Sequence, residues 1–238
     1  MQARSKQLLT IENAKTIKGE KLGYLTGILY LAPARESGVM DTCPMSTAGC
    51  RAGCLFTAGR ASFTPSIITA RINKTKWLHE DRTSFVDQLR KNIASLIRKA
   101  KRANLIPAVR INGTSDLPQL ALQMAGEFPE VQFYDYSKLP RVWQRARANY
   151  HLTFSHSETN LSDCIDTLNR GINVAVVFNT PRSKPLPDTW HGFPVVNGDT
   201  HDLRFLDQHR IGLVIGLHAK GKAKKDKTGF VQIAPLGL

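Results

Sequence analysis

The stretch Gly23-Tyr24-Leu25-Thr26-Gly27-Ile28-Leu29-Tyr30-Leu31 is the first of several short apolar runs that decide the fold. It is rich in residues that favour strands and is followed by Ala32-Pro33, so it predicts a buried strand. Several of the later runs lack polar alternation, which is typical of parallel strands covered on both faces. These later runs lie at residues 106–111, 131–136, 151–154, 174–178, 193–196 and 213–217.

Helical segments separate many of these runs. In residues 83–103, for example, Phe85, Leu89 and Ile93 recur at helical spacing and predict one buried face. Alternation of strands and helices predicts an α/β protein with a parallel sheet. With about seven strands, we expect a TIM-like parallel β/α barrel, complete or partial, that forms one domain over residues 1–238. The other predicted helices cover residues 65–79, 117–128, 139–148 and 161–171.

The charge balance indicates a polyanionic partner. The chain has 33 Lys and Arg residues against 19 Asp and Glu, a formal net charge of +14. Such a balance favours nucleic acid, because binding releases the counterions of the phosphates. We expect DNA, with RNA as the alternative. No run is long and apolar enough for a membrane span and the N-terminus lacks a signal core, so we expect a cytoplasmic protein without a membrane partner.

Three of the four cysteines lie close together in a loop at residues 41–60, directly after the first predicted strand. Thiolates at such short spacing indicate a metal site formed by Cys43, Cys50 and Cys54. Two occupants fit this pattern. A [4Fe–4S] cluster held by three thiolates would keep one iron open for a ligand, whereas Zn²⁺ would need a fourth ligand such as His79 or His156.

Polar residues follow most of the predicted strands, at the ends where α/β enzymes place their chemistry. Asp116 and Asp202 could each cap a following helix instead, but polar residues at so many strand ends indicate an active site. The candidate catalytic residues are Asp116, Asp135, Asp199 and Asp202. The candidate substrate-binding residues are Arg110, Asn112, Ser115, Tyr136, Lys138, Ser155, Ser157, Glu158, Asn160 and His201.

A basic loop at residues 218–228 follows the last long apolar run. Its glycine, Gly221, would let the backbone approach a ligand, and its lysines would bind a nucleic-acid backbone as flexible point charges. A solvated loop without a partner is the alternative reading. The candidate nucleic-acid-binding residues are Lys220, Lys222, Lys224, Lys225 and Lys227.

Four motifs in order resemble a group of small phage-encoded three-cysteine α/β-barrel proteins. They are Cys-Pro-x5-Cys-x3-Cys from Cys43, Arg-Ile-Asn-Gly-Thr-Ser-Asp from Arg110, Phe-Tyr-Asp-Tyr-Ser-Lys from Phe133 and Thr-Phe-Ser-His-Ser-Glu from Thr153. The position of the cysteines resembles the radical S-adenosylmethionine superfamily, in which three cysteines after the first strand hold a [4Fe–4S] cluster. A looser similarity links the chain to the phage guanine transglycosylases, barrel enzymes that place 7-deazaguanine bases into DNA.

The transglycosylase resemblance implies specific roles for the aspartates. One strand-end aspartate attacks the sugar and another serves as acid or base, which implies Asp116 as the acid/base and Asp199 or Asp202 as the nucleophile. We therefore expect an enzyme that exchanges guanine for a 7-deazaguanine base, supplied as a small-molecule precursor, in an infected bacterial host. The alternatives are a radical enzyme that uses S-adenosylmethionine, and a non-catalytic nucleic-acid-binding protein whose metal only staples the cysteine loop.

Overall fold

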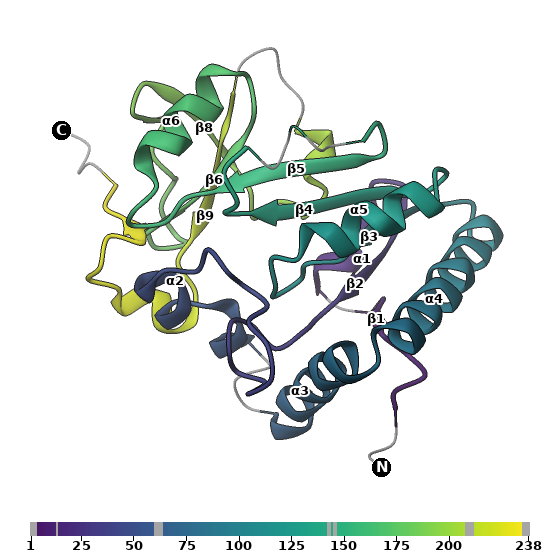
Figure 1. Cartoon of the computed structure of the whole chain (residues 1–238). Helices are drawn as coiled ribbons and strands as arrows, with labels where there is room; N and C mark the ends of the chain where they lie inside the picture. The colour runs from purple at the N-terminus through teal and green to yellow at the C-terminus, as the bar shows by residue number, and fades with distance from the viewer. Residues whose placement is uncertain are drawn as a thin grey trace.

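A ten-stranded mixed sheet forms the centre of the protein in the computed structural model, which describes residues 4–12, 14–59, 64–141, 144, 147–207 and 212–234 (Figure 1). All seven predicted strands are present, and three two-residue strands add to them. The strands are β1 (Leu9–Thr10), β2 (Tyr24–Leu29), β3 (Ile106–Arg110), β4 (Gln132–Ser137), β5 (Tyr150–Ser155), β6 (Val174–Phe178), β7 (Thr189–Trp190), β8 (Phe193–Asn197), β9 (Val214–His218) and β10 (Val231–Gln232).

The expectation of a parallel β/α barrel is wrong, because the sheet is open and mixed. Its order is β1-β2-β3-β4-β5-β6-β9-β8-β7, with β10 beside the end of β6. β1 pairs antiparallel with the outer edge of β2, and β7 pairs antiparallel with β8 at the opposite end. These short strands occupy the edges that a barrel would have to join. In addition, β9 lies between β6 and β8, so the last strands do not follow the order of the chain.

Four of the described helices cover one face of the sheet (Figure 1). α4 buries Phe85, Leu89 and Ile93 completely against the strands, as its helical spacing predicts. Each such side chain contributes about 1.5–3 kcal/mol of hydrophobic stabilisation. The helices on this face are α3 (Pro65–Glu80), α4 (Arg82–Arg102), α5 (Pro118–Glu127) and α6 (Leu161–Asn169).

The helix predicted over residues 139–148 lies partly outside the described residues, and its first three residues are not helical. Two short helices were not predicted, α1 (Ala14–Glu20) and α2 (Ala48–Ala52). None of the helices in the described residues has the length and apolar character needed to cross a membrane.

The second face of the sheet has a thinner cover. The 3-10 turn Arg204–Leu206 packs Phe205 edge-on against Tyr24 of β2 and Tyr134 of β4. Leu203 belongs to the same apolar cluster. Because this cover lies over the starts of the central strands, their carboxyl ends remain available to line a cavity.

Candidate functional site

A cavity of about 480 Å³ opens at the carboxyl ends of the parallel strands. Its floor is formed by side chains of β3, β4, β6 and β9, and its walls by α2 and by the loops after the strands. Parallel strands bring their carboxyl ends to one edge, and ligand sites of open α/β sheets lie there. The candidate residues from the sequence that line it are Cys43, Cys50, Cys54, Arg110, Asn112, Ser115, Asp116, Tyr136, Lys138, Ser155, Asp199, His201, Asp202 and Lys220.

Asp116 is a buried carboxyl group in the wall of this cavity. It accepts hydrogen bonds from the Ser137 hydroxyl at 2.8 Å and from the backbone N–H of Lys138 at 2.8 Å. Burial raises its pKa above the ordinary range, and these two hydrogen bonds only partly oppose that effect. Asp116 is therefore the carboxyl group of the cavity that is suited to hold and donate a proton.

Asp199 lies in the same cavity in the opposite electrostatic environment. Burial alone would raise its pKa, but an ion pair with Lys220 and the N–H of His218, which donates at 3.1 Å, outweigh it and lower the pKa. The Lys18 ammonium also donates to the backbone carbonyl of Asp199 at 2.6 Å. Asp199 is therefore a stabilised carboxylate.

Asp202 is bound to the floor of the cavity. Arg110 Nη1 donates to its two carboxylate oxygens at 3.0 and 3.2 Å, and the Tyr134 hydroxyl donates to Oδ2 at 3.2 Å. The guanidinium of Arg110 also lies over the Tyr136 ring, 4.6 Å from its centroid. Burial would lower the pKa of Arg110, but Asp202 and its other neighbours raise it, so Arg110 stays a cation beside the Asp202 carboxyl group.

Asp135 does not line the cavity, although the sequence suggests it as a catalytic residue. It is buried behind the cavity and accepts bonds from the backbone N–H of Asn112 at 2.7 Å, from Asn112 Nδ2 at 3.0 Å and from the Tyr150 hydroxyl at 3.2 Å. Asn112 in turn accepts bonds from Ser115 Oγ and Leu117 N. Asp135 thus fixes the loop that carries Asp116, and burial raises its pKa to about 7.

Glu158 also has a structural contact instead of a place in the cavity wall. Its carboxylate accepts hydrogen bonds from the Thr47 hydroxyl and from the backbone N–H of Gly49, each at 2.6 Å. Thr47 caps α2 by accepting from the N–H of Cys50. Glu158 therefore anchors the cysteine-bearing helix to the loop after β5. The other two candidates from that loop, Ser157 and Asn160, bond each other, because Asn160 Oδ1 accepts from Ser157 N at 2.7 Å.

The prediction of a metal held by the three cysteines is wrong. Cys43, Cys50 and Cys54 all line the cavity, but among the described residues no group of three or more His, Cys, Asp or Glu side chains is arranged to hold a metal ion. Burial raises the pKa of Cys43 to about 11 and also raises that of Cys54, so both side chains are thiols in this structure.

This correction covers both proposed occupants of the cysteine site. Zn²⁺ and [4Fe–4S] need the same thiolate set, and S-adenosylmethionine was expected only together with the cluster. The two histidines suggested as further ligands do not line the cavity either: His79 is exposed at the end of α3, and His156 is buried against Trp190.

The basic loop lies beside the cavity as a 3-10 segment, Gly221–Lys225. Lys220 and Ala223 line the cavity, while Lys222, Lys224, Lys225 and Lys227 are exposed. Asp226 holds the segment in shape by accepting bonds from the Thr228 hydroxyl at 2.7 Å and the N–H of Val231 at 3.0 Å. The lysines thus lie beside the cavity on a folded segment.

Sequence reasoning missed two cations of the cavity, Lys18 and Arg182. Arg182 follows β6, so extending the search for polar strand ends to that strand would have found it. Lys18 lies on α1, which precedes the first long strand, and no strand-end signal points to it.

The fold and the cavity define this molecule as an α/β protein with an open mixed sheet and a charged, thiol-lined cavity at its carboxyl edge. A family model described as Gene product 88 matches residues 6–233, so the chain belongs to that family. This is a family of phage proteins, which confirms the expected phage origin and places synthesis in an infected host cell. No curated protein and no solved structure matches the chain. The family match carries no information about transglycosylase or radical chemistry.

Proposed function

We propose that this protein is a phage DNA-modifying enzyme that exchanges guanine for a 7-deazaguanine base. One observation carries the proposal: Asp116 and Asp199 line the same cavity, and their environments shift their pKa values in opposite directions. Two carboxyl groups whose pKa values differ in this way can serve as an acid and a nucleophile at one pH. Base exchange at a sugar carbon needs both roles.

In this proposal Asp199 is the nucleophile. Its carboxylate attacks C1′ of the target nucleotide, forming a C1′–O bond as the C1′–N9 bond to guanine breaks. Asp202 is less suited to attack, since the two side chains that donate to its oxygens, Arg110 and Tyr134, are buried. Lys220 pairs with Asp199 from a more exposed position, with 32% of its side chain accessible, so it can move aside when substrate enters.

Asp116 is the acid and base of the proposed cycle. It donates its proton to the departing guanine, which leaves as a neutral base. The incoming 7-deazaguanine then attacks C1′, its N–H proton passes to the Asp116 carboxylate, and the bond between C1′ and Asp199 breaks. Both carboxyl groups return to their starting states, and no oxidant or reductant is needed.

The exposed lysines around the cavity support a polynucleotide as the partner, with DNA favoured and RNA as the alternative. Lys222, Lys224 and Lys225 would contact phosphates on either side of the target nucleotide. A base inside a duplex must be flipped out at a cost of about a few kcal/mol, which these contacts would offset. We expect this reaction in the cytoplasm of the infected host.

An exchange assay tests the proposal. Purified protein is incubated with a guanine-containing oligonucleotide and an isotope-labelled 7-deazaguanine precursor, and label in the oligonucleotide is measured. Asp116→Asn and Asp199→Asn should abolish incorporation, whereas the matched control Asp188→Asn, at an exposed position outside the cavity, should retain it. If all three variants bind DNA and keep their biological activity, the protein is a non-catalytic nucleic-acid-binding protein instead.

A further inference from the structure

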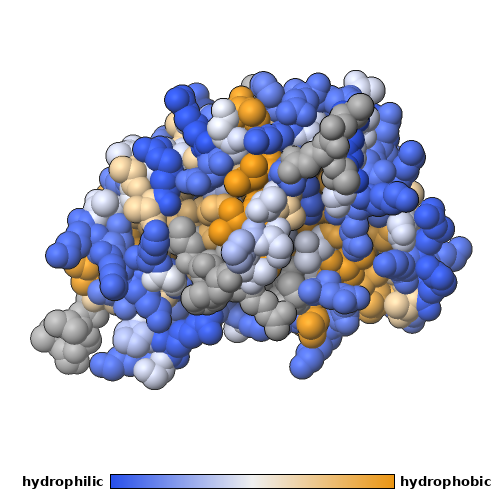
Figure 2. All heavy atoms as spheres, turned by 90° about the horizontal axis from the view of Figure 1, so that it is seen from below, coloured by the Kyte–Doolittle hydropathy of each residue, from blue (hydrophilic) through white to orange (hydrophobic). Residues whose placement is uncertain are grey.

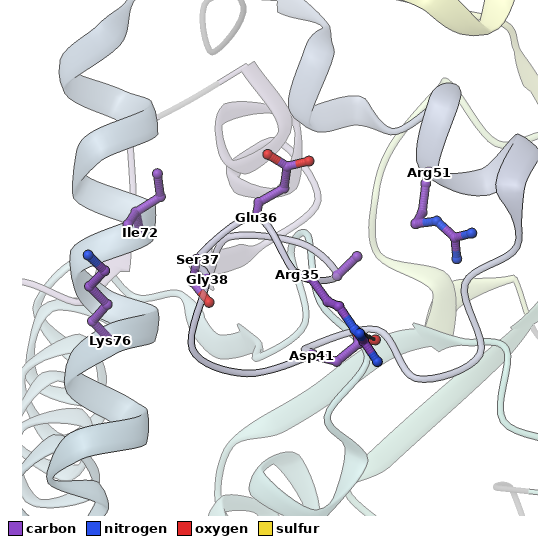
Figure 3. A pocket seen from close by; sticks show the side chains of 9 residues that line it. Arg35, Glu36, Ser37, Gly38, Asp41, Arg51, Ile72 and Lys76 are labelled. Carbon is purple, nitrogen blue, oxygen red and sulfur yellow. Dashed lines mark ion pairs between the residues drawn. The ribbon is translucent and has the colours of Figure 1, made fainter.

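A second cavity, of about 900 Å³, lies on the other side of α2 from the strand-end cavity. Figure 3 shows Arg35 and Asp41 side by side on the loop after β2, Arg51 extending from α2, and Ile72 and Lys76 on α3. We refer to it as the α2–α3 groove. None of its lining residues has a role in the proposed exchange reaction.

The loop that forms one wall of the groove has a fixed shape. Ala34 and Gly38 adopt positive φ angles of 46° and 77°, and Thr42 N donates to Ala34 O at 3.0 Å. The Thr75 hydroxyl on α3 accepts from Ala32 N at 2.9 Å, which ties the start of the loop to the opposite wall. The groove therefore has a defined shape, as a binding site requires.

The charges in the groove leave two cations available. Arg35 pairs with Asp41 at 3.6 Å, and Asp41 also accepts from the N–H of Cys43. Among the described residues, no carboxylate is in ion-pair contact with Arg51 or Lys76. Arg51 Nη1 donates to the backbone carbonyl and the hydroxyl of Ser46, and neither of these neutral groups balances its charge. Glu36 is the remaining acid of the lining, and in Figure 3 its carboxylate points toward the top of the view, separate from both Arg51 and Lys76. Two available cations in a fixed groove suit an anionic ligand.

The groove and the strand-end cavity share a wall. Asp41 lines the groove and Cys43 lines the strand-end cavity. Likewise Arg51 lines the groove, and the residue before it, Cys50, lines the strand-end cavity. The basic 3-10 segment lies close to α2 on the strand-end side, where Gly53 packs near Ala223. Figure 2 shows the lower side of the molecule largely covered by hydrophilic residues, with apolar residues in small areas.

We propose that the α2–α3 groove is a second nucleic-acid subsite, in which Arg51 and Lys76, on its opposite sides, each bind a backbone phosphate of the strand that carries the target nucleotide. This inference rests on the proposed function for its partner. The lysines of residues 222–227 would hold the strand on one side of α2 and the groove would hold it on the other. Each phosphodiester group carries one negative charge, which one of these cations would balance without a metal ion.

Salt-dependent binding of a labelled single-stranded oligonucleotide tests this subsite. Each phosphate contact contributes about 0.7 to the slope of log affinity against log salt concentration for single strands. Arg51→Gln/Lys76→Gln should lower the magnitude of the slope by about 1.4, the contribution of two phosphate contacts. The matched control Lys91→Gln/Arg98→Gln, which removes two exposed cations from α4, should leave it unchanged. Thermal melting verifies that both variants are folded.

A second probe, deoxyguanosine monophosphate, distinguishes binding in the groove from binding in the strand-end cavity. Its affinity should be the same in the wild type and in the groove variant, because it is too short to reach both cavities. An equal loss of slope in the control variant, or an equal loss of nucleotide affinity in the groove variant, would overturn the inference. The inference would also be overturned if the groove variant lost binding to polyglutamate but kept its binding to the oligonucleotide, since the groove would then fit an acidic protein.

These binding measurements do not depend on catalysis. If the slope changes only in the groove variant and the protein shows no base exchange, the subsite is supported and the exchange reaction is rejected. Base exchange with unchanged slopes in all variants would reject the subsite alone.

Discussion

Replacing Asp202 by Asn should destabilise the protein strongly, because it removes the negative charge that balances a buried arginine. The side chains of Arg110 and Asp202 are only 7% and 11% exposed. Breaking a buried ion pair by removing one partner costs about 3–5 kcal/mol, since the other charge stays buried without compensation. Asn can still accept one hydrogen bond from Arg110, so we expect a loss near 3 kcal/mol of unfolding free energy.

The matched comparison is Asp199→Asn, which breaks a more exposed pair. Lys220 and Asp199 are 32% and 18% exposed, and exposed pairs contribute about 0–1 kcal/mol. Urea unfolding followed by circular dichroism measures both values. The double variant Arg110→Met/Asp202→Asn should recover part of the loss, because no uncompensated charge remains.

A loss for Asp202→Asn below about 1 kcal/mol, or equal to that of Asp199→Asn, would contradict this expectation. It would mean that Arg110 and Asp202 are not held as a buried pair. Asp202 would then be as free to act as a nucleophile as Asp199.

Three further predictions follow from named contacts. Gly49→Ala should destabilise the protein by about 1–3 kcal/mol in thermal melting, because the added Cβ would lie 2.7 Å from Phe230 Cβ and closer still to the Thr228 hydroxyl. Asp135 has a folded-state pKa of about 7, above its unfolded value, so its contribution to stability is full below about pH 4 and is lost as pH rises through 7. Unfolding at several pH values should show this loss in the wild type and not in Asp135→Asn. Base exchange should decline as pH rises through the raised pKa of Asp116, since the departing base needs its proton, and a pH profile that rises throughout would contradict that role.

The local elements of the fold follow from the sequence, whereas the closure of the sheet does not. Apolar runs such as residues 106–111 and 174–178 predict strands, because a parallel strand that is covered on both faces needs consecutive apolar side chains. The placement of β9 between β6 and β8, and the two-residue strands at the edges, depend on long-range packing that no local pattern records. The sequence therefore predicts the strands correctly and the barrel wrongly.

The sequence also predicts the candidate site only in part. Polar residues after parallel strands must meet at one edge, so Arg110, Asp116 and Asp199 could be placed together from the sequence. The cysteines are close in sequence, but the turn of α2 and the burial of Cys43 and Cys54 decide how their thiols lie and titrate. Spacing alone could not show that these thiols line a cavity without forming a metal site.

In the proposed reaction, Asp199 displaces a base from its sugar in the strand-end cavity. Incubation with a guanine-containing oligonucleotide, without an incoming base, followed by an acid quench and peptide mass spectrometry, tests it directly. We expect free guanine and an oligonucleotide joined through C1′ to the Asp199 carboxylate, with both absent in Asp199→Asn. Release of guanine with no adduct, or with the adduct on Asp202, would contradict it.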